Sequence, residues 1–535
     1  MSLTQAFNIS VGAMGVHQNV INIMSNNIAN MNTEGYHKQK AQLGTLVLGL
    51  PIGESVSRQV KTSAGVELIK VQRYETSFLG SYYRDQLSDK AMLDKQADSL
   101  GDIAGLFDDL SGRGLDTALE DFYDALDNLN QYPTDMSARI HVLNAASTLT
   151  TSMNNIANNL NQLKAQDVGD GVSEDSLKNS NIYNSVQNVN ATLDELASIN
   201  KMLVQSQTGS LENNNLLDRR DALLNELAKY GNFTTDIMSN GTVTLSIGGT
   251  PIVSGTKIYG KLDVQTAAQY DEYCQKAGIE NTNTSNAVLM FKREDGLVLQ
   301  NINDKITSGE LGAMVNNAST ENGLNLDTVM QSLDKLAQAI ADVFNNLQTR
   351  EGAFYLDNAT GQLQLCNDNL EDYVWFVAND GSTTITASNI SINSLLTEEG
   401  GYNKIAAAYF ENYDPADPDS VDLNAIGNAD NIISMIKTKT DATSTEFDIL
   451  GNIPFADFYT GLLSKITSGL QNVQDAANIQ SEVIEALDNK AASETSVDLN
   501  EELAELIRSQ TAYAASARVF TTCNTLFDTI LNLGL

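Results

Sequence analysis

The sequence is poor in the residues from which catalytic and metal centres are built. Its 535 residues include three histidines and three cysteines. Cys274, Cys366 and Cys523 lie far apart and are odd in number, so they predict neither a disulfide framework nor a zinc site. Phosphate-binding loops of the GxxxxGK[ST] and GxGxxG types are absent. We therefore expect no enzyme, no catalytic residue, no metal and no cofactor.

Positive charge and long apolar runs are also scarce. The chain has 32 basic and 68 acidic residues, a net charge of −36, which disfavours nucleic acid or an anionic membrane as a partner. No run of 18 apolar residues occurs, so no membrane-spanning helix is predicted. The N-terminal segment lacks the basic and apolar regions of a secretory signal, and we expect no cleaved signal.

A seven-residue repeat runs through the end of the chain, from residue 497 to residue 531. The first row of the repeat is Leu499, Leu506, Tyr513, Phe520 and Phe527. The second row is Leu503, Gln510, Ala517, Asn524 and Leu531. Rows that alternate four and three residues apart predict the seam of a coiled coil, in which the two polar residues would fix the register. A helix with one apolar stripe needs a partner to be stable in water.

The first thirty residues carry a matching repeat. One row is Phe7, Met14, Ile21 and Ile28, and the other is Leu3, Ser10, His17, Met24 and Met31. Because both ends present a seam, we expect them to pair, either within one chain or with other copies of it.

The chain between the ends is too long for one core, and its periodicity changes several times. We expect an α+β multidomain protein with long terminal coiled-coil helices, a helical rod and inserted mostly-β domains. Within it we expect helix over 309–350 and a short strand over 383–392. The expected domains are a terminal domain of residues 1–74 and 491–535, a helical rod of 75–231, 309–350 and 431–490, a mostly-β domain of 232–308, and a small irregular β insertion of 351–430.

Four consecutive charged residues, Asp218 to Asp221, lie inside an apolar helical segment. They are open to two interpretations. The charges could pair on the surface of their own helix, as residues three or four apart do. Alternatively, they could form salt bridges with a neighbouring subunit.

Sequence motifs at both ends resemble those of the axial proteins of the bacterial flagellum. The N-terminal motif SNNIANMNTEGYHKQ covers residues 25–39, and the C-terminal one is the repeat described above. The family residues matched in the first motif are Asn26, Asn27, Asn30, Asn32, Gly35 and Tyr36. The pair His37-Lys38 departs from the Ser-Arg pair usual there, but Lys38 keeps the charge.

Two motifs in the middle of the chain narrow the resemblance to the hook-associated protein 1 family. NLLDRRDALLNELAKYG covers residues 215–231, and GELGAM covers 309–314, followed by LDKLAQAIADVFNNLQ over 333–348. The matched residues of the first are Leu217, Asp218, Arg220, Asp221 and Leu224.

The resemblance implies a structural adaptor subunit of the hook–filament junction. It implies export through the flagellar type III apparatus after a transient stay in the cytoplasm, where a chaperone holds the C-terminal helix. It also implies an extracellular ring of copies at the hook tip, in contact with hook protein and hook-associated protein 3. A chaperone that covered the first row of the C-terminal repeat would prevent premature association.

Two alternatives remain open at this point. The chain could be another flagellar axial protein, such as hook-associated protein 3 or a hook protein, although the helical rod and the middle motifs favour neither. It could also be an exported protein with an activity in its β insertions, although those segments lack a catalytic constellation.

Overall fold

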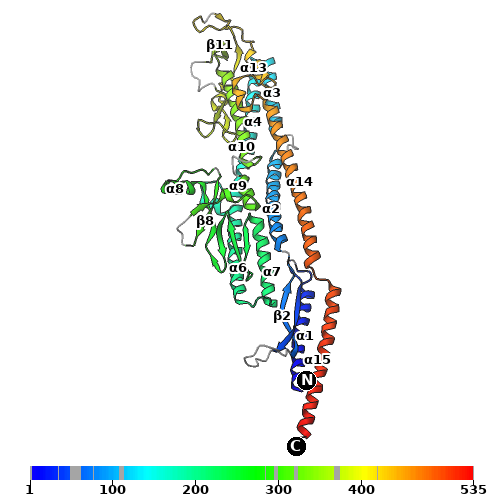
Figure 1. Cartoon of the computed structure of the whole chain (residues 1–535). Coiled ribbons are helices and arrows are strands. Elements are labelled where there is room, and N and C mark those ends of the chain that lie inside the picture. The colour runs from blue at the N-terminus through cyan, green and yellow to red at the C-terminus, as the bar shows by residue number, and fades with distance from the viewer. Residues whose placement is uncertain are drawn as a thin grey trace.

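The computed structural model describes the chain except for residues 1–2, 34, 49–61, 76, 108–113, 284, 295–298, 318–322, 367–373, 418–419 and 534–535. The molecule is elongated, and both chain ends lie at the same tip of it (Figure 1). In the described residues, no helix is long and apolar enough to cross a membrane.

The terminal domain pairs the two ends of the chain. Helix α1 (Leu3–Ala29) lies along α15 (Leu499–Leu533), and an antiparallel hairpin of β1 (Gln39–Leu48) and β2 (Thr62–Arg73) packs against α1. The buried core of this part is small, consisting of Val20, Ile23, Met24 and Val71. The two ends therefore pair within one chain, which is one of the two arrangements that the matching repeats predicted.

A bundle of long helices extends from the terminal domain. Helix α2 runs beside α14 over much of its length (Figure 1). Phe122, Phe344 and Trp375 meet in the core of the bundle, with ring centroids 5.0 to 6.2 Å apart. Its main helices are α2 (Ser77–Leu106), α3 (Leu115–Gln131), α4 (Met136–Val168), α10 (Leu326–Thr349), α13 (Asp430–Lys437) and α14 (Phe455–Thr495).

A second core lies where helices cover two small antiparallel sheets. Helices α6 and α7 pack against strands β4, β5, β7 and β8 through side chains such as Leu193, Leu224 and Leu245. The helices here are α5 (Glu174–Lys178), α6 (Asn181–Gln205), α7 (Leu211–Tyr230), α8 (Ala267–Ala277) and α9 (Gly309–Asn317). One sheet has the order β3 (Thr234–Ile237), β4 (Val243–Ile247), β5 (Thr250–Ser254), β6 (Lys257–Ile258), and the other β7 (Gly260–Thr266), β8 (Ala287–Arg293), β9 (Leu299–Asn301).

The far tip of the molecule carries short strands. They form a sheet of order β11-β10-β14 and a pair β12-β13. The strands are β10 (Ala353–Asp357), β11 (Gln362–Leu365), β12 (Phe376–Ala378), β13 (Ile390–Ile392) and β14 (Ala406–Tyr409), with the short helix α12 (Ser394–Thr397). The α+β class and the pairing of the long terminal helices are thus confirmed.

Two local expectations need correction. The stretch 309–350 is two helices, because Asn325 and Thr328 form a reciprocal capping box that starts α10. Of 383–392, only the end is a strand, because the Asn389 side chain donates to Asp380, Ser382 and Thr384 and folds the preceding residues into a loop.

The cores do not follow the linear order of the chain. Trp375, from the segment 351–430, is buried in the helical bundle, whereas α6 and α7 share their core with the sheets of 232–308. We keep the four-part division of the chain as a proposal about its organisation.

Candidate functional site

Three members of the first row of the C-terminal repeat, Leu506, Phe520 and Phe527, face the N-terminal helix, whereas Leu499 is 38% exposed. The ring of Phe7 lies 4.8 Å from that of Phe520 and 6.0 Å from that of Phe527, between centroids. Leu506 packs against the buried core formed by Val20, Ile23, Met24 and Val71. Tyr513, between these positions, is at the edge of the contact with 36% of its surface exposed.

The second row of the repeat does not face the N-terminal helix. Leu503 is 42% exposed and Leu531 is 68% exposed, while Gln510 and Asn524 are exposed and Ala517 is half-buried. The buried residues of α15 are instead Glu502, Ser509 and Cys523, which lie three residues after first-row positions rather than four. Gln510 and Asn524 therefore do not fix the register of this helix pair.

Small and polar side chains explain this choice of face. Ser509 and Cys523 let the backbone of α1 approach closely, and Glu502 is bound by groups at the base of the hairpin. Hydrophobicity favours the other face, because Leu503 and Leu531 are apolar and Glu502 is not. The outer apolar set of α15 is thereby left in solvent: Leu499, Leu503, Ile507, Tyr513, Val519, Leu526, Ile530 and Leu531.

The N-terminal row lies between α15 and the hairpin. Met24 is buried, and Leu3, Phe7, Met14, Ile21 and Ile28 are half-buried, whereas Met31 is exposed. The remaining buried apolar residues of α1 are Val16, Val20 and Ile23, which the repeat did not include. They were missed because α1 packs on two partners at once, and a single seven-residue seam describes only one.

Asn27, from the N-terminal motif, ties three segments together. Its Nδ2 donates to the backbone oxygen of Gln39 at 2.8 Å and to Oε2 of Glu502 at 2.9 Å. Its Oδ1 accepts from the backbone N–H of Gln39 at 3.1 Å and from the hydroxyl of Tyr36 at 2.8 Å. Asn27 is fully buried, so it fixes the end of α1, the start of β1 and the start of α15.

The other motif residues shape the turn after α1. Asn30 donates to the side chain and backbone oxygens of Asn26, and Gly35 has a φ of +75°, which favours glycine. Asn32 is exposed. Burial, followed by the charges of Asp218 and Glu502, raises the pKa of Tyr36 well above its usual value, so its hydroxyl keeps its proton.

Lys38 links the hairpin to the start of the C-terminal helix. Its Nζ lies 2.6 Å from Glu501 and 3.4 Å from Glu502, and its backbone N–H donates to the oxygen of Thr495 at 2.9 Å. Partial burial disfavours its charge, but the two glutamates raise its pKa above the usual value. The charge that the family pattern has at this position therefore has a structural use.

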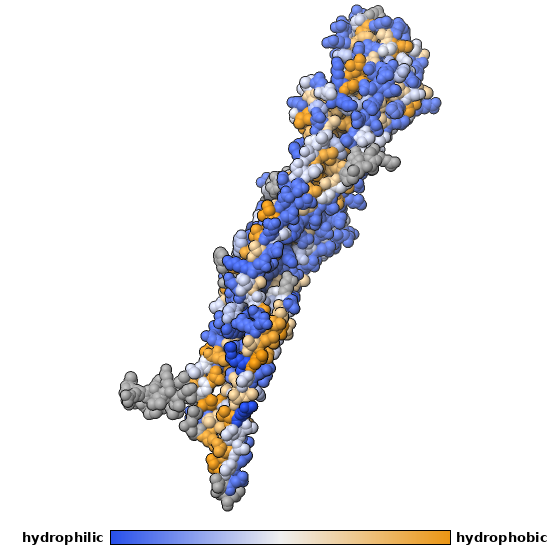
Figure 2. Space-filling model, turned by 90° about the vertical axis from the view of Figure 1, so that its right-hand side faces the viewer, coloured by the Kyte–Doolittle hydropathy of each residue, from blue (hydrophilic) through white to orange (hydrophobic). Residues whose placement is uncertain are grey.

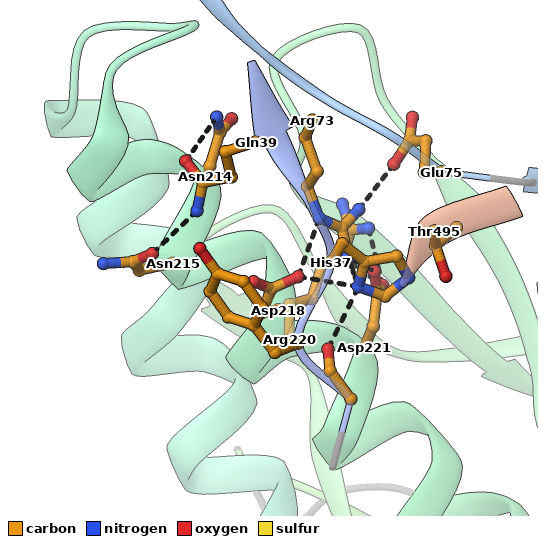
Figure 3. A network of polar contacts seen from close by, with 12 residues as sticks. His37, Gln39, Arg73, Glu75, Asn214, Asn215, Asp218, Arg220, Asp221 and Thr495 are labelled. Carbon is orange, nitrogen blue, oxygen red and sulfur yellow. Dashed lines mark hydrogen bonds and ion pairs between the residues drawn. The ribbon is translucent and has the colours of Figure 1, made fainter. Parts of the chain in front are cut away.

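Arg73 connects the terminal domain to α7 (Figure 3). Its guanidinium lies 2.8 Å from Oδ1 of Asp218, 2.6 Å from Oδ2 of Asp221 and 2.6 Å from Glu75. His37 completes the cluster, with Nδ1 2.8 Å from the same oxygen of Asp218. We call these five residues the polar joint. Burial disfavours the charge of Arg73, but Asp221 and Asp218 raise its pKa above the usual value.

Arg220, which lies on α7 like Asp218 and Asp221, also contacts the polar joint. It donates to Oδ1 of Asp221 at 2.6 Å and to the backbone oxygen of Gly241 at 2.6 Å. Burial disfavours the charge of Asp221, but Arg220 and Arg73 lower its pKa below the usual value. Gly241 lies in the β3–β4 turn, so the cluster also holds the first sheet.

The charged cluster 218–221 thus has a use that neither sequence interpretation included. Asp218 and Asp221 are paired within the chain, across the boundary with the terminal domain. Only Arg219 points outward, where it meets Glu195 on α6 at 2.5 Å. The remaining motif residues, Leu217 and Leu224, are half-buried and buried respectively against the second core. The local spacing gave no signal for Arg73, because it lies 145 residues before Asp218.

Amide side chains extend the contact. Gln39 receives a hydrogen bond from Asn214 and donates one to Asn215, both at 3.0 Å. Asn214 also donates to the backbone oxygen of Val71 at 3.1 Å. The backbone N–H of Val71 in turn donates to the backbone oxygen of Gly209 at 2.7 Å. The terminal domain is therefore attached to α7 by ion pairs and hydrogen bonds rather than by a hydrophobic core.

These side chains position helices and do not form a centre for chemistry. In the part of the chain that the structure describes, no group of three or more His, Cys, Asp or Glu side chains could hold a metal ion. The polar joint and the paired terminal helices instead connect the tip of the molecule to its helical body.

Comparison with known proteins agrees with this arrangement. The family model for the flagellar hook-associated protein FlgK helical domain matches residues 100–363. A model for the C-terminal part of flagellar basal body rod FlgEFG proteins matches 490–533, and one for flagella basal body rod proteins matches 7–37. The last two cover the terminal helices.

Relatives match along nearly the whole chain. Flagellar hook-associated protein 1 of Bacillus subtilis is 22% identical, over 97% of this chain and 96% of its own. That of Salmonella typhimurium is 24% identical, over 99% of this chain and 100% of its own. The fold resembles that of the flagellar hook junction protein FlgK from Burkholderia pseudomallei, with a TM-score of 0.54 and 13% identity over 77% of this chain and 99% of that one. The chain belongs to the flagellar hook-associated protein 1 (FlgK) family.

Proposed function

We propose that this chain is a structural subunit of the flagellar hook–filament junction, outside the cell. The observation that carries the proposal is the match, over almost the full length, to hook-associated protein 1 of two distantly related bacteria. As a member of this family it is a flagellar axial protein that assembles with other components, and it is not an enzyme.

The outer apolar set of α15 supports assembly through the terminal helices. Ile507 is 61% exposed and Leu503 is 42% exposed, on a helix whose other face already contacts α1. Figure 2, viewed from the side on which α15 lies, shows hydrophobic residues over this end of the molecule, whereas the middle is mainly hydrophilic. Exposed apolar residues gathered in this way mark an interaction surface. In our proposal, other copies in a ring cover it.

Specific partners follow from the same reasoning. We propose that hook protein and hook-associated protein 3 lie on either side of the ring, and that the type III export apparatus delivers the chain. Before export, a cytoplasmic chaperone would cover the outer apolar set of α15 and prevent association. The terminal domain would form the inner tube of the junction and the β domains would face outward.

Charge substitution in the outer apolar set tests the proposal. We expect the double variant Leu503→Glu with Ile507→Glu to be secreted as a folded monomer, because both side chains are exposed. It should fail to join hook to filament, so cells should release filament subunits and lack filaments in electron micrographs. The matched control is Ile279→Glu. Ile279 is 54% exposed in the loop between α8 and β8, and cells with this variant should swim normally.

Antibody labelling distinguishes a junction subunit from other flagellar axial proteins. Label confined to the hook tip agrees with a junction subunit. Label along the hook, or normal filaments on cells that lack the gene, would contradict the proposal.

A further inference from the structure

A groove of about 1180 Å³ opens beside the polar joint, between the terminal domain, α2, α7 and the end of α14. Its apolar lining includes Leu79, Tyr83, Leu217, Ile237 and Met238. Ile237 and Met238 are 42% and 43% exposed, so the groove presents apolar surface to solvent. We call it the joint groove.

Arg84 lies in the wall of the joint groove with few partners. It is 9% exposed, and its one hydrogen bond runs from Nη2 to the hydroxyl of Thr235 at 3.3 Å. No described carboxylate lies within 4.0 Å of its guanidinium, which folds back over Gly80 at the groove wall. Because Gly80 has no side chain, this face of the guanidinium is left uncovered.

The other buried arginines of the described chain have acceptors within the chain. Arg73 and Arg220 are paired with carboxylates, and Arg139 donates to the backbone oxygens of Pro133, Tyr402, Asn403 and Ile405. A guanidinium has five N–H donors. No Arg84 nitrogen is among the described buried atoms that lack a hydrogen-bond partner, so its unpaired N–H groups are open to the groove. The charges of Asp221 and Asp85 act on Arg84 without forming an ion pair with it, so its open N–H groups can donate to an acceptor from outside the chain.

A second copy of the chain supplies the required chemistry. With 68 acidic and 32 basic residues, each copy carries many carboxylates. The joint groove is also continuous with the outer apolar set of α15, because Val497 lines the groove and Leu499 begins that set two residues later. A neighbour seated on α15 therefore reaches the groove.

We propose that the joint groove is a contact between copies of this chain, in which a carboxylate flanked by apolar side chains of the neighbour pairs with Arg84. The proposal rests on the assembly proposed above and adds a second, sequence-specific contact to it. It gives Arg84 a role in association and none in the stability of the monomer.

Photo-crosslinking in intact flagella tests the contact. The photoreactive p-benzoylphenylalanine replaces Met238 in the full chain, with the same replacement at Ile279, outside the groove, as control. We expect irradiation to give a covalent dimer of this chain from Met238 in flagella, and none from Ile279 or from the purified monomer. Absence of an adduct, or an adduct with a different protein, would overturn the proposal.

The variant Arg84→Gln tests the charge. We expect the dimer yield from Met238 to fall by about thirtyfold or more, the low end of the range for loss of one partner of a buried charge pair at an interface. The melting temperature of the purified monomer should stay the same or rise, because the guanidinium makes one long hydrogen bond. A lower melting temperature with an unchanged dimer yield would show that Arg84 is a structural residue and would overturn the proposal.

Labelling of the unmodified chain keeps the two proposals apart. If that chain is absent from the hook–filament junction, the proposed function fails. If it is present there and Met238 gives no dimer, only the joint groove contact fails.

Discussion

Arg73 is the residue on which the attachment of the terminal domain depends most. Its side chain is 4% exposed and is surrounded by Asp218, Asp221 and Glu75. Replacing it with an apolar residue removes the guanidinium that Asp218 and Asp221 share, so Asp221 keeps only Arg220 and Asp218 keeps only His37, both in a partly buried place. Such a loss is far more costly than the loss of a surface ion pair.

The variant Arg73→Met should therefore loosen the joint. We expect the free energy of unfolding to fall by roughly 3 kcal/mol, the range for breaking a buried ion pair. Melting followed by circular dichroism measures it, with Arg219→Met as control, because the pair of Arg219 with Glu195 is exposed. An equal loss in both variants would contradict the role of Arg73.

Acid should weaken the same contact. The pKa of Asp221 is lowered in the folded chain, so its contribution to stability is present above its unfolded pKa of about 3.9 and is lost as the pH falls through the folded value. We expect the melting temperature of the native chain to fall steeply on acidification below about pH 4. For Asp221→Asn the melting temperature should be lower at neutral pH and should fall less on acidification. Parallel curves would contradict this.

At the scale of elements, the sequence predicted which helices pair and could not determine which faces meet. The first row of α15 was found because Leu506, Phe520 and Phe527 are apolar at a spacing of seven. The second row was misplaced because the true contact uses Glu502 and Ser509, whose suitability depends on Asn27, Lys38 and the approach of α1. A hydrophobic pattern holds no information about a polar seam that is satisfied by residues from the other end of the chain.

The contacts of the polar joint also could not be predicted from the sequence. The motif of residues 215–231 identified the family and marked Asp218 and Asp221, yet their partner Arg73 lies in a strand whose other side chains indicate only a hairpin. By contrast, the Asn240-Gly241 turn between β3 and β4 depends on neighbours in sequence, and such a turn is predictable from local residues.

The variant Asn27→Ala should detach the start of α15 from the base of the hairpin. Glu502 would lose the amide that binds it while staying buried, and the backbone of Gln39 would lose both of its hydrogen bonds to Asn27. We expect a loss of roughly 2 to 4 kcal/mol and faster amide exchange at the start of α15. Asn32→Ala is the matched control, since Asn32 is an exposed residue of the same motif and should change stability by less than about 0.5 kcal/mol.

At the scale of the whole molecule, stability is uneven. The helical bundle and the second core bury many large side chains, whereas the buried cluster of the terminal domain has four members among the described residues. Local opening is favoured where few apolar contacts are buried. The terminal helices are therefore held more weakly than the rest of the described chain.

Amide hydrogen exchange should show this difference. In the purified chain we expect α15 to exchange faster than α4, whose apolar face is buried in the bundle. In isolated flagella α15 should become protected, because neighbouring copies cover its outer apolar set. Equal protection of α15 in monomer and flagella would mean that assembly uses another surface.

Both chain ends lie at one tip of the molecule, and the turn between β10 and β11 lies near the opposite tip (Figure 1). In the proposed arrangement, a fluorescent reporter fused to either end would be carried into the crowded centre of the growing appendage. Residues 358–361 of that turn, which are exposed, offer a place for a small label far from it. Live imaging of this subunit therefore calls for an internal tag rather than a terminal one.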